Sequence, residues 1–441
     1  MGRKKIGHKE EAVTQSKQPS RKKFITPVKS AKSMSSEDKR NFRNDIMNSL
    51  IEANRQKFGV ENVLSTSTEM EQLIVGVPTP SLAFEYLIMN DVFPLKTLTM
   101  VAGKWGSCKT SLALEFFRWV RMADGFCAFI NTEQKFDADL AYGLLRETPE
   151  DQPFLYLAAG SVEKYQQMLT LSLQAYKKIP KASEIPGIFC IDSLASATSE
   201  STHEKIEKDG HASKGFAVHA LLNKEYISKL KNDYAQWPIS IVFINHIKDN
   251  VTPQGIPTKN TLGGQAVNYH ESFEIHSTVR DKNVSCANYT GTLLELQCVK
   301  NSYGRTGNKI PARFLHTIVD DENGVPQDVH YWDWNWSIVA LLHGILNDAK
   351  TQYGSLNKKR LQERGIKLHV EGSVNAITAK GYMPNLGMEK SDSLPISELG
   401  QKIHENQEVC DLIRDALNIK RRVAFAKPME DHIQDFVESA E

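Results

Sequence analysis

The chain of 441 residues lacks the features that mark membrane, secreted and zinc-stabilised proteins. It has no run of about 18 uncharged apolar residues, the length that a membrane-spanning helix needs. Its polar, basic N-terminus has no apolar centre of the kind found in signal peptides. Its six cysteines are scattered, with no Cys-x-x-Cys pair and no histidine at metal-ligand spacing. The sequence therefore predicts a cytoplasmic globular protein with free thiols and no membrane contact.

A net positive charge is lacking outside the N-terminus. Residues 1–36 hold ten Lys or Arg against Glu10 and Glu11, whereas the remaining residues hold 44 basic and 51 acidic side chains. The basic clusters at 3–5 and 21–23 are separated by Ser, Gln and Pro, a composition typical of disordered segments that attract polyanions. We expect a disordered basic arm at residues 1–35. A solubilising tail or a targeting signal fits this composition equally well.

The hydrophobic pattern divides the rest of the chain into three parts. Residues 36–58 begin with a helix-capping sequence and carry apolar side chains at helical spacing, which predicts a helix in an N-terminal segment ending at 94. Residues 95–334 alternate between strand-like and helix-like patterns. Residues 335–441 are punctuated by Gly, Ser and Pro but have helical spacing at 338–349 and 408–416. We expect this last part to be a small α-rich C-terminal domain or appendage.

The central part predicts a doubly wound α/β domain with a mostly parallel sheet. Its apolar runs are continuous, as expected for parallel strands that helices cover on both faces. The expected strands are 98–102, 126–131, 154–158, 187–191, 239–245 and 273–280, and the expected helices are 110–122, 138–146, 161–178 and 216–234. Two strands with more alternation, 292–299 and 313–319, should extend the sheet in antiparallel fashion.

A phosphate-binding loop follows the first of these strands. The pattern GxxxxGK[ST] is met by Gly103, Lys104, Trp105, Gly106, Ser107, Cys108, Lys109 and Thr110, except that Cys108 replaces the last Gly. Backbone N–H groups at such a helix N-terminus favour phosphate, the Lys reaches the β- and γ-phosphates, and the hydroxyl binds Mg²⁺. The sequence therefore predicts a P-loop that binds ATP and Mg²⁺. A Gly-rich turn with an exposed Lys is the alternative.

Two acids follow neighbouring strands of the same domain. Asp192 ends an apolar strand, where a carboxylate can help to hold Mg²⁺. Glu133 ends the strand at 126–131, where a carboxylate can orient and deprotonate an attacking water. Because ligands of α/β proteins bind at the carboxyl ends of the strands, both acids should lie in one crevice with the P-loop.

With these motifs, residues from about 65 to 320 resemble the RecA family of recombinases, with an α/β RecA-type P-loop ATPase core. Four segments carry the resemblance: Cys127-Ala-Phe-Ile-Asn-Thr-Glu133, Cys190-Ile-Asp192-Ser193-Leu-Ala, Phe243-Ile-Asn245-His246-Ile-Lys and Leu262-Gly263-Gly264-Gln265-Ala266. The resemblance implies that Glu133 is catalytic, that Asp137 contacts the adenine and that His246 senses the γ-phosphate. Cys108 and His246 depart from bacterial RecA and are similar to the phage UvsX-type branch.

The family resemblance also implies self-association. It predicts a helical filament on single-stranded DNA, with ATP between neighbouring subunits and residues 36–94 as the polymerisation segment. Lys300 stands where the family has a Lys that reaches the neighbouring subunit's γ-phosphate, like an arginine finger. Ser302 replaces a second family Lys, so Arg305 is a candidate substitute.

Two polar segments after the strand-end motifs are the expected DNA-binding loops, at about 198–214 and 248–261. Amides, hydroxyls and Lys side chains there would contact phosphates without reading sequence, and an apolar residue would wedge between bases. The candidate DNA-binding residues are Lys205, Lys208, Lys214, Lys248, Asn250, Val251, Ile256, Lys259, Gly263 and Gly264.

The expected activity is a DNA-dependent ATPase that performs homologous pairing and strand exchange between single-stranded and duplex DNA. Single-strand-binding and loader proteins would be further partners, in the host cytoplasm or nucleoid if the protein is viral. Two alternatives share the core: a hexameric helicase, and a RecA paralogue that uses ATP binding to scaffold a partner recombinase. The helicase would need a helical N-terminal collar, for which residues 1–94 are short.

Overall fold

The computed structural model describes residues 36–58, 75–145, 154–200, 202, 215–234, 237–251, 257–261, 270–286, 289–320, 326–347, 355–376 and 378–424. The chain divides near residue 66 into two units. The expected basic arm at 1–35 lies outside the described residues. None of the helices in these ranges is long and apolar enough to cross a membrane.

The first unit contains the helix α1 (Ser36–Phe58), with the bounds that the sequence predicts. Ile46, Met47 and Leu50 on α1 are each about half exposed. Apolar side chains exposed in a row on one helix are a common mark of an interaction surface.

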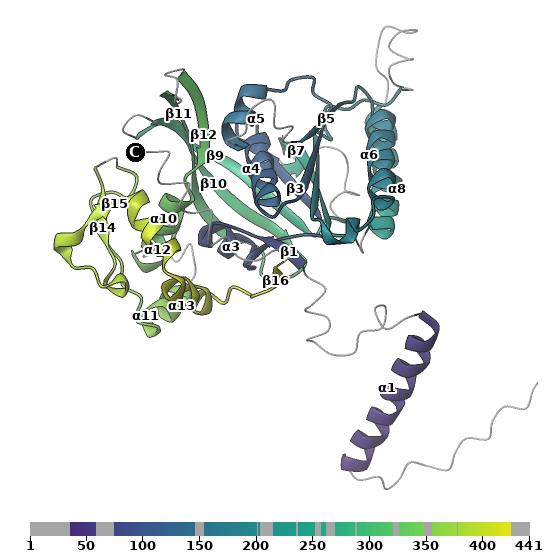
Figure 1. Cartoon of the computed structure of the whole chain (residues 1–441), viewed down its shortest axis with the longest axis horizontal. Coiled ribbons are helices and arrows are strands. Elements are labelled where there is room, and N and C mark those ends of the chain that lie inside the picture. The colour runs from purple at the N-terminus through teal and green to yellow at the C-terminus, as the bar shows by residue number, and fades with distance from the viewer. Residues whose placement is uncertain are drawn as a thin grey trace, which may run out of the picture. The chain divides into compact units, whose positions relative to one another are not determined.

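The second unit is built on a ten-stranded sheet (Figure 1). Its strands lie in the order β12-β11-β10-β9-β3-β7-β6-β4-β5, and β8 pairs with β7. The six strands from β9 to β5 are parallel, while β10, β11 and β12 continue the sheet in antiparallel fashion. The doubly wound α/β fold and its antiparallel extension are therefore confirmed. The strand bounds are β3 (Leu98–Gly103), β4 (Phe126–Asn131), β5 (Leu155–Ala158), β6 (Gly187–Asp192), β7 (Ile239–Val251), β8 (Pro257–Thr261), β9 (Phe273–Cys286), β10 (Tyr289–Asn301), β11 (Lys309–Asp320) and β12 (Pro326–Trp332).

Helices cover both faces of the parallel strands, which explains the continuous apolar runs. On β3, Leu98, Met100 and Ala102 join a core with α6 (Val162–Lys177) and α8 (Gly215–Tyr234). Val101 joins a second core with α4 (Lys109–Met122), on the side that also carries α5 (Ala138–Leu145). A short 3-10 helix, η3 (Ala182–Glu184), precedes β6.

Of the strands that are longer than the sequence predicts, two run furthest beyond their expected ends. β7 was expected to end at Asn245 but continues to Val251, because residues 247–251 pair with β8 as an antiparallel hairpin. The segment expected to be the second DNA-binding loop is thus partly a β-hairpin. β9 continues to Cys286 because its end pairs with the start of β10. Both extensions are polar, so an apolar run could not predict them.

The C-terminal part shares a hydrophobic core with the large sheet and α4. Trp336 and Leu399 belong to one buried cluster with Phe116 of α4 and Leu296 of β10. The helices expected at 338–349 and 408–416 are confirmed as α10 and α13. The domain boundary at 335 stays a prediction. The elements of this part are α10 (Trp334–Asn347), α11 (Ser355–Glu363), β13 (His369–Glu371), β14 (Lys380–Tyr382), η4 (Pro384–Leu386), η5 (Lys390–Asp392), β15 (Leu394–Pro395), α12 (Ile396–Glu405) and α13 (Gln407–Leu417).

The last described segment returns to the start of the second unit. β16 (Val423–Ala424) pairs in parallel with β1 (Val75–Pro78), which pairs with β2 (Val92–Pro94). Between β1 and β2 lies α3 (Leu82–Ile88). Segments nearly 350 residues apart in sequence, Val75 and Val423, are thus neighbours in one small sheet.

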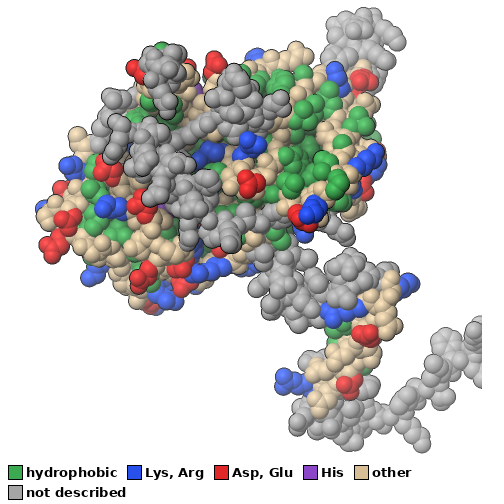
Figure 2. Space-filling model, in the orientation of Figure 1, with side chains coloured by type: hydrophobic (Ala, Val, Ile, Leu, Met, Phe, Trp, Pro, Cys, Tyr) green, Lys and Arg blue, Asp and Glu red, His purple; other side chains and the backbone are tan. Residues whose placement is uncertain are grey.

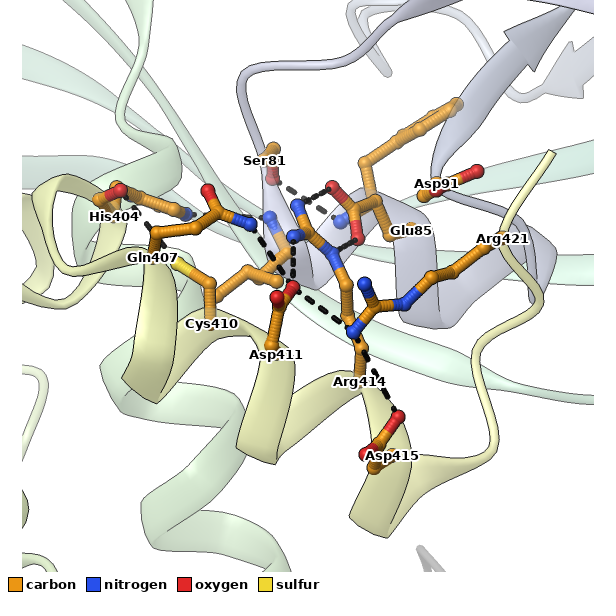
Figure 3. Close-up of polar contacts among 12 residues, drawn as sticks. Ser81, Glu85, Asp91, His404, Gln407, Cys410, Asp411, Arg414, Asp415 and Arg421 are labelled. Carbon is orange, nitrogen blue, oxygen red and sulfur yellow. Dashed lines mark hydrogen bonds and ion pairs between the residues drawn. The ribbon is translucent and has the colours of Figure 1, made fainter. Parts of the chain in front are cut away.

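Buried polar contacts fasten the last helices to α3 (Figure 3). Arg414 of α13 binds Glu85 with two bonds, Nε to Oε2 at 2.7 Å and Nη2 to Oε1 at 2.8 Å. Glu85 is buried, and its pairing raises the pKa of Arg414 further. His404 Nε2 accepts the Leu82 N–H at 3.2 Å, and its Nδ1 lies 2.7 Å from Asn335 Oδ1. This arrangement requires a neutral imidazole that carries its proton on Nδ1.

We expect Arg414→Met to lower the free energy of unfolding by ~3–5 kcal/mol, because it leaves the Glu85 carboxylate buried without its cation. Urea unfolding followed by circular dichroism measures this change. Lys359→Met is the control, since Lys359 and Glu363 form an exposed pair at 3.6 Å, where a loss of at most ~0.5 kcal/mol is expected. Glu85→Gln combined with Arg414→Met should recover part of the loss. A loss at Arg414 no larger than the control's would contradict the role of this pair.

His404 should make stability depend on pH. Burial lowers the pKa of His404 to about 4, below the ~6.5 of an unfolded chain. Since the fold favours the neutral ring, this contribution is complete above pH ~6.5 and is lost as the pH falls towards 4, by up to ~3 kcal/mol. The difference in unfolding free energy between wild type and His404→Gln should therefore shrink over that range. A constant difference for His404→Gln would refute the assignment.

Candidate nucleotide-binding site

The P-loop connects β3 to α4 and has the backbone shape that a phosphate cradle requires. A Cβ on Gly103 would lie 2.3 Å from Ser107 Oγ and 2.6 Å from the Ser277 carbonyl oxygen, so only glycine fits. Gly106 has a φ of 74°, in the left-handed region. Ser277 Oγ of β9 donates to the Ser107 carbonyl at 2.6 Å. Close approach at Gly103 and the hydrogen bond from β9 therefore fix the shape of the loop.

Cys108 adopts the conformation that normally favours glycine. It is the N-cap of α4 with φ 53° and ψ 33°, which costs a non-glycine residue roughly 1–2 kcal/mol. Burial raises the pKa of its thiol to about 11. The side chain thus stays a neutral thiol and brings no negative charge to the loop. Cys108 therefore keeps the backbone shape of the loop at the energetic cost of a left-handed conformation.

Lys109 and Thr110 occupy the first turn of α4. Lys109 Nζ donates to the Lys104 carbonyl at 2.9 Å, at the rim of the loop. Burial lowers the pKa of Lys109, while Asp192 and Glu133 act to raise it. Thr110 Oγ1 donates to Asp192 Oδ2 at 2.6 Å. The Lys, the hydroxyl and the strand-end acid expected from the sequence therefore lie together.

Asp192 is a buried acid at the carboxyl end of β6. Burial and the nearby Glu133 raise the pKa of Asp192 to about 6, against the hydrogen bond from Thr110. No cluster of three or more His, Cys, Asp or Glu side chains suited to a metal occurs in the described ranges. The available donors are one carboxylate and one hydroxyl. These fit Mg²⁺, which is commonly held by one or two protein oxygens together with substrate phosphates and water.

Glu133 lies just beyond β4 and receives three hydrogen bonds on one oxygen. Its Oε1 accepts from Ser193 Oγ at 2.7 Å and Ser196 Oγ at 2.8 Å, and lies 2.9 Å from His246 Nε2. The bond from His246 and those from the two serines lower the pKa of Glu133 to about 2, against a smaller effect of burial. Glu133 is therefore an oriented and fully ionised carboxylate.

Strand register brings these groups to one edge of the sheet. His246 on β7 lies opposite Gly103 on β3, and Asp192 on β6 lies opposite Asn131 on β4. Thr132 fastens the two acidic strands, since its hydroxyl donates to the Ser193 carbonyl at 2.7 Å and accepts the Ser193 N–H at 2.8 Å. The structure thus brings Lys109, Thr110, Glu133, Asp192 and His246 together.

Two other candidate residues lie apart from this cluster. Asp137 is exposed, and its Oδ1 accepts the Leu140 N–H at 3.0 Å near the start of α5. Lys300 lies near the end of β10, opposite Glu274 of β9, which is itself paired with Met100. That position is towards the amino end of β3, away from the P-loop. Lys300 therefore does not join the nucleotide cluster of its own chain.

The structure does not describe the side chains of the expected DNA-binding residues. Their backbones divide into two groups. Four residues lie in the β7–β8 hairpin, namely Lys248, Asn250, Val251 and Lys259. The other six lie outside the described residues, namely Lys205, Lys208, Lys214, Ile256, Gly263 and Gly264.

Three hydroxyl residues of the site were not predicted from the sequence: Thr132, Ser193 and Ser196. Ser193 directly follows the strand-end Asp192, and Thr132 directly precedes Glu133. That adjacency was an available signal. Ser196 had no such signal, because only the turn after β6 brings its hydroxyl back to Glu133.

Comparison with known proteins gives a family. The model of the RecA N-terminal domain matches residues 45–311. Protein RecA of Mycoplasma mobile is 24% identical over 342 residues, which cover 76% of this chain and 96% of that protein. Protein RecA of Bacteroides thetaiotaomicron is 23% identical over 246 residues, 56% of this chain and 70% of that protein.

A third relative, Protein RecA of Mycobacterium bovis, is 23% identical over 255 residues, 58% of this chain. The chain spans only 30% of that relative's length. The family match and the site geometry agree on the same segment, since every residue of the nucleotide cluster lies within 45–311. The chain belongs to the RecA family, defined by its RecA N-terminal domain.

Proposed function

We propose that the chain is an ATP-dependent DNA recombinase that forms helical filaments on single-stranded DNA and catalyses homologous pairing and strand exchange. One observation carries the proposal: Lys109, Thr110, Asp192, Glu133 and His246 lie together at the carboxyl edge of a RecA-family sheet. A scaffold without hydrolysis would not need an acid held by three donors beside the P-loop.

ATP would bind with its phosphates on residues 103–110 and with its adenine towards Asp137. Thr110 and Asp192 would hold Mg²⁺, which offsets phosphate charge when bound. Burial favours the protonated form of Asp192, whereas a divalent cation favours the ionised carboxylate. Binding of Mg²⁺ would therefore release a proton from Asp192.

Glu133 would orient the attacking water. Its three donors converge on Oε1, and Oε2 has no hydrogen-bond partner among the described residues. With a pKa of about 2, this carboxylate is a weak proton acceptor while those bonds persist. His246 would link ATP binding to the basicity of Glu133. A shift of the His246 ring towards the γ-phosphate would remove a hydrogen-bond donor from Glu133 and make Glu133 a stronger base.

Self-association is supported by exposed apolar side chains in both units. α1 presents Ile46, Met47 and Leu50. β5, an edge strand of the sheet, exposes Leu155 at 52% and Tyr156 at 42%. Hydrophobic side chains gather over β5 in Figure 2. An exposed apolar edge strand is a template for another chain, and heterologous contacts that do not close produce helical polymers.

Lys300 would act in the neighbouring subunit's site. Its place away from its own P-loop fits a cation supplied in trans. Residues 248–261 and the segment at 198–214 would contact DNA phosphates, together with the basic arm. Single-strand-binding and loader proteins would be further partners.

We also propose that the chain lies closest to the phage UvsX-like branch of the family. Two departures from bacterial RecA support this placement: Cys108, in a left-handed conformation, and His246, which contacts Glu133.

We expect Glu133→Gln to lower DNA-stimulated ATP hydrolysis by ~10²–10⁴-fold, because the water loses its base. Nucleotide affinity should stay unchanged. Lys109→Ala should weaken ATP binding by roughly 10–100-fold through loss of its phosphate bonds. Calorimetric titration with a slowly hydrolysed ATP analogue separates the two effects, and the exposed Lys181→Ala is the control. Wild-type affinity in Lys109→Ala would remove the P-loop assignment.

Mixing two inactive variants tests the filament. Glu133→Gln fails in its own site, whereas Lys300→Ala fails at the site of its neighbour. A mixed filament should contain some junctions in which both groups are wild type, so partial DNA-stimulated ATPase should return. Recovery should depend on the mixing ratio and disappear in dilute protein. Full activity of Lys300→Ala as an isolated monomer would favour a self-contained ATPase, and electron micrographs showing closed rings would favour the helicase.

A further inference from the structure

The tip of the P-loop carries a large exposed aromatic ring. Trp105 is 82% exposed, whereas Trp119, Trp332, Trp334 and Trp336 are all buried. A tryptophan gains most from burial or from a partner on its face. Its exposure on the loop that binds phosphate therefore calls for a partner.

That partner is Lys282 on the extended end of β9. Its Nζ lies 5.6 Å from the centroid of the Trp105 ring, within the range of a cation–π contact. The same Nζ is 3.9 Å from the point that a Cβ on Gly106 would occupy. The ammonium therefore lies directly against the backbone of the phosphate cradle. β9 continues past Ser277, its pairing position with Gly103, and this continuation carries Lys282 alongside the loop.

In the part of the chain that the structure describes, Lys282 has no carboxylate partner, unlike Arg280 on the same strand and Lys309 on β11. Arg280 binds Glu295 at 2.6 Å, and Lys309 binds the same carboxylate at 3.0 Å. Among the described residues, the partner of the Lys282 ammonium is the face of Trp105. A cation–π contact at an exposed site is weaker than a charge-assisted bond to phosphate. A phosphate arriving in the cradle would therefore draw this ammonium away from the ring.

We propose that Lys282 is a second phosphate-binding cation of this site, held against Trp105 until a nucleoside triphosphate binds. It then moves from the ring to the terminal phosphate, while Lys109 stays on the inner side of the loop. Trp105 is a positioning residue that keeps the ammonium beside the cradle. This inference rests on the proposed nucleotide binding at residues 103–110 and assigns roles to two residues beyond the Lys, Thr and acid of that site.

Measurements of nucleotide affinity test whether the positive charge of Lys282 binds phosphate. Dilute full-length protein without DNA is titrated with ADP and with a slowly hydrolysed ATP analogue, so that neighbouring subunits do not contribute. Lys282→Met keeps the aliphatic stem and should weaken binding of the analogue about tenfold, the effect of one lost charge-assisted bond, with a smaller effect on ADP. Lys282→Arg should restore most of the affinity. Arg280→Met is the matched control on the same strand and should bind both nucleotides normally.

Trp105 supplies a second readout. Acrylamide quenching of tryptophan fluorescence reports mainly this exposed ring, and the Trp105→Phe variant gives the background. The analogue should change the quenching of wild type, because the ammonium leaves the ring, and should leave Lys282→Met unchanged. If the contact between Trp105 and Lys282 only stiffened the loop, Lys282→Met would lower the melting temperature and would weaken the binding of ADP and of the analogue equally.

The outcomes separate this inference from the proposed function. Wild-type binding of the analogue by Lys282→Met, or equal losses for both nucleotides, overturns the role of Lys282 while Lys109→Ala still binds the analogue weakly. Normal binding by Lys109→Ala overturns the P-loop assignment itself.

Discussion

The parallel register of four strands is the constraint on which the rest of the site depends. β3 and β7 place His246 opposite Gly103, and β4 and β6 place Asp192 opposite Asn131. Parallel pairing makes these strands end at one edge, where the groups that follow them meet. A slip of one residue in either pair would turn the side chains to the other face of the sheet. Apolar side chains packed on both faces resist such a slip. The chemistry at the edge is thus fixed by packing in the interior.

At that edge, two carboxylates are given opposite environments. Asp192 is buried and its pKa is raised to about 6, whereas Glu133 accepts three hydrogen bonds and its pKa is lowered to about 2. Environments that move two acids apart usually mark different roles. Asp192 suits a bound cation, whose positive charge would stabilise the buried carboxylate. Glu133 suits a water molecule, which would join the existing hydrogen-bond network around its carboxylate. Ser193 serves both, because it follows the first acid and donates to the second. The separation therefore arises from one turn after β6.

The sequence predicted the parts of this arrangement that apolar patterns and adjacent motifs encode. The strands at 126–131 and 187–191 were found because burial on both faces leaves a continuous apolar run. The helix at 36–58 was found because its apolar side chains recur at helical spacing. The hairpin ends at Val251 and Cys286 were missed because their sequences are polar and the strands there are defined by backbone pairing. Ser196 and Lys282 were missed because only the fold brings them to Glu133 and Trp105. Adjacency in sequence can reveal a site's first residues, but contacts between distant segments need the structure.

Contacts from α3 and from the last described segment hold the strand end that carries Lys300, the cation proposed to act in the neighbouring subunit. Lys300 is followed by Asn301, whose Nδ2 donates to the Ile88 carbonyl at 2.7 Å. The turn continues to Tyr303, whose carbonyl accepts from Lys420 Nζ at 3.2 Å and from Arg422 Nη2 at 3.5 Å. The strand end that carries Lys300 is therefore held by α3 on one side and by the last described segment on the other. A cation that must reach another subunit's phosphate loses less entropy on binding when its backbone is already fixed. The residues that fix it from the C-terminal side lie beyond 311, outside the segment matched to the family. The C-terminal part thus helps to fix the strand end that carries Lys300, although none of its described residues belongs to the nucleotide cluster.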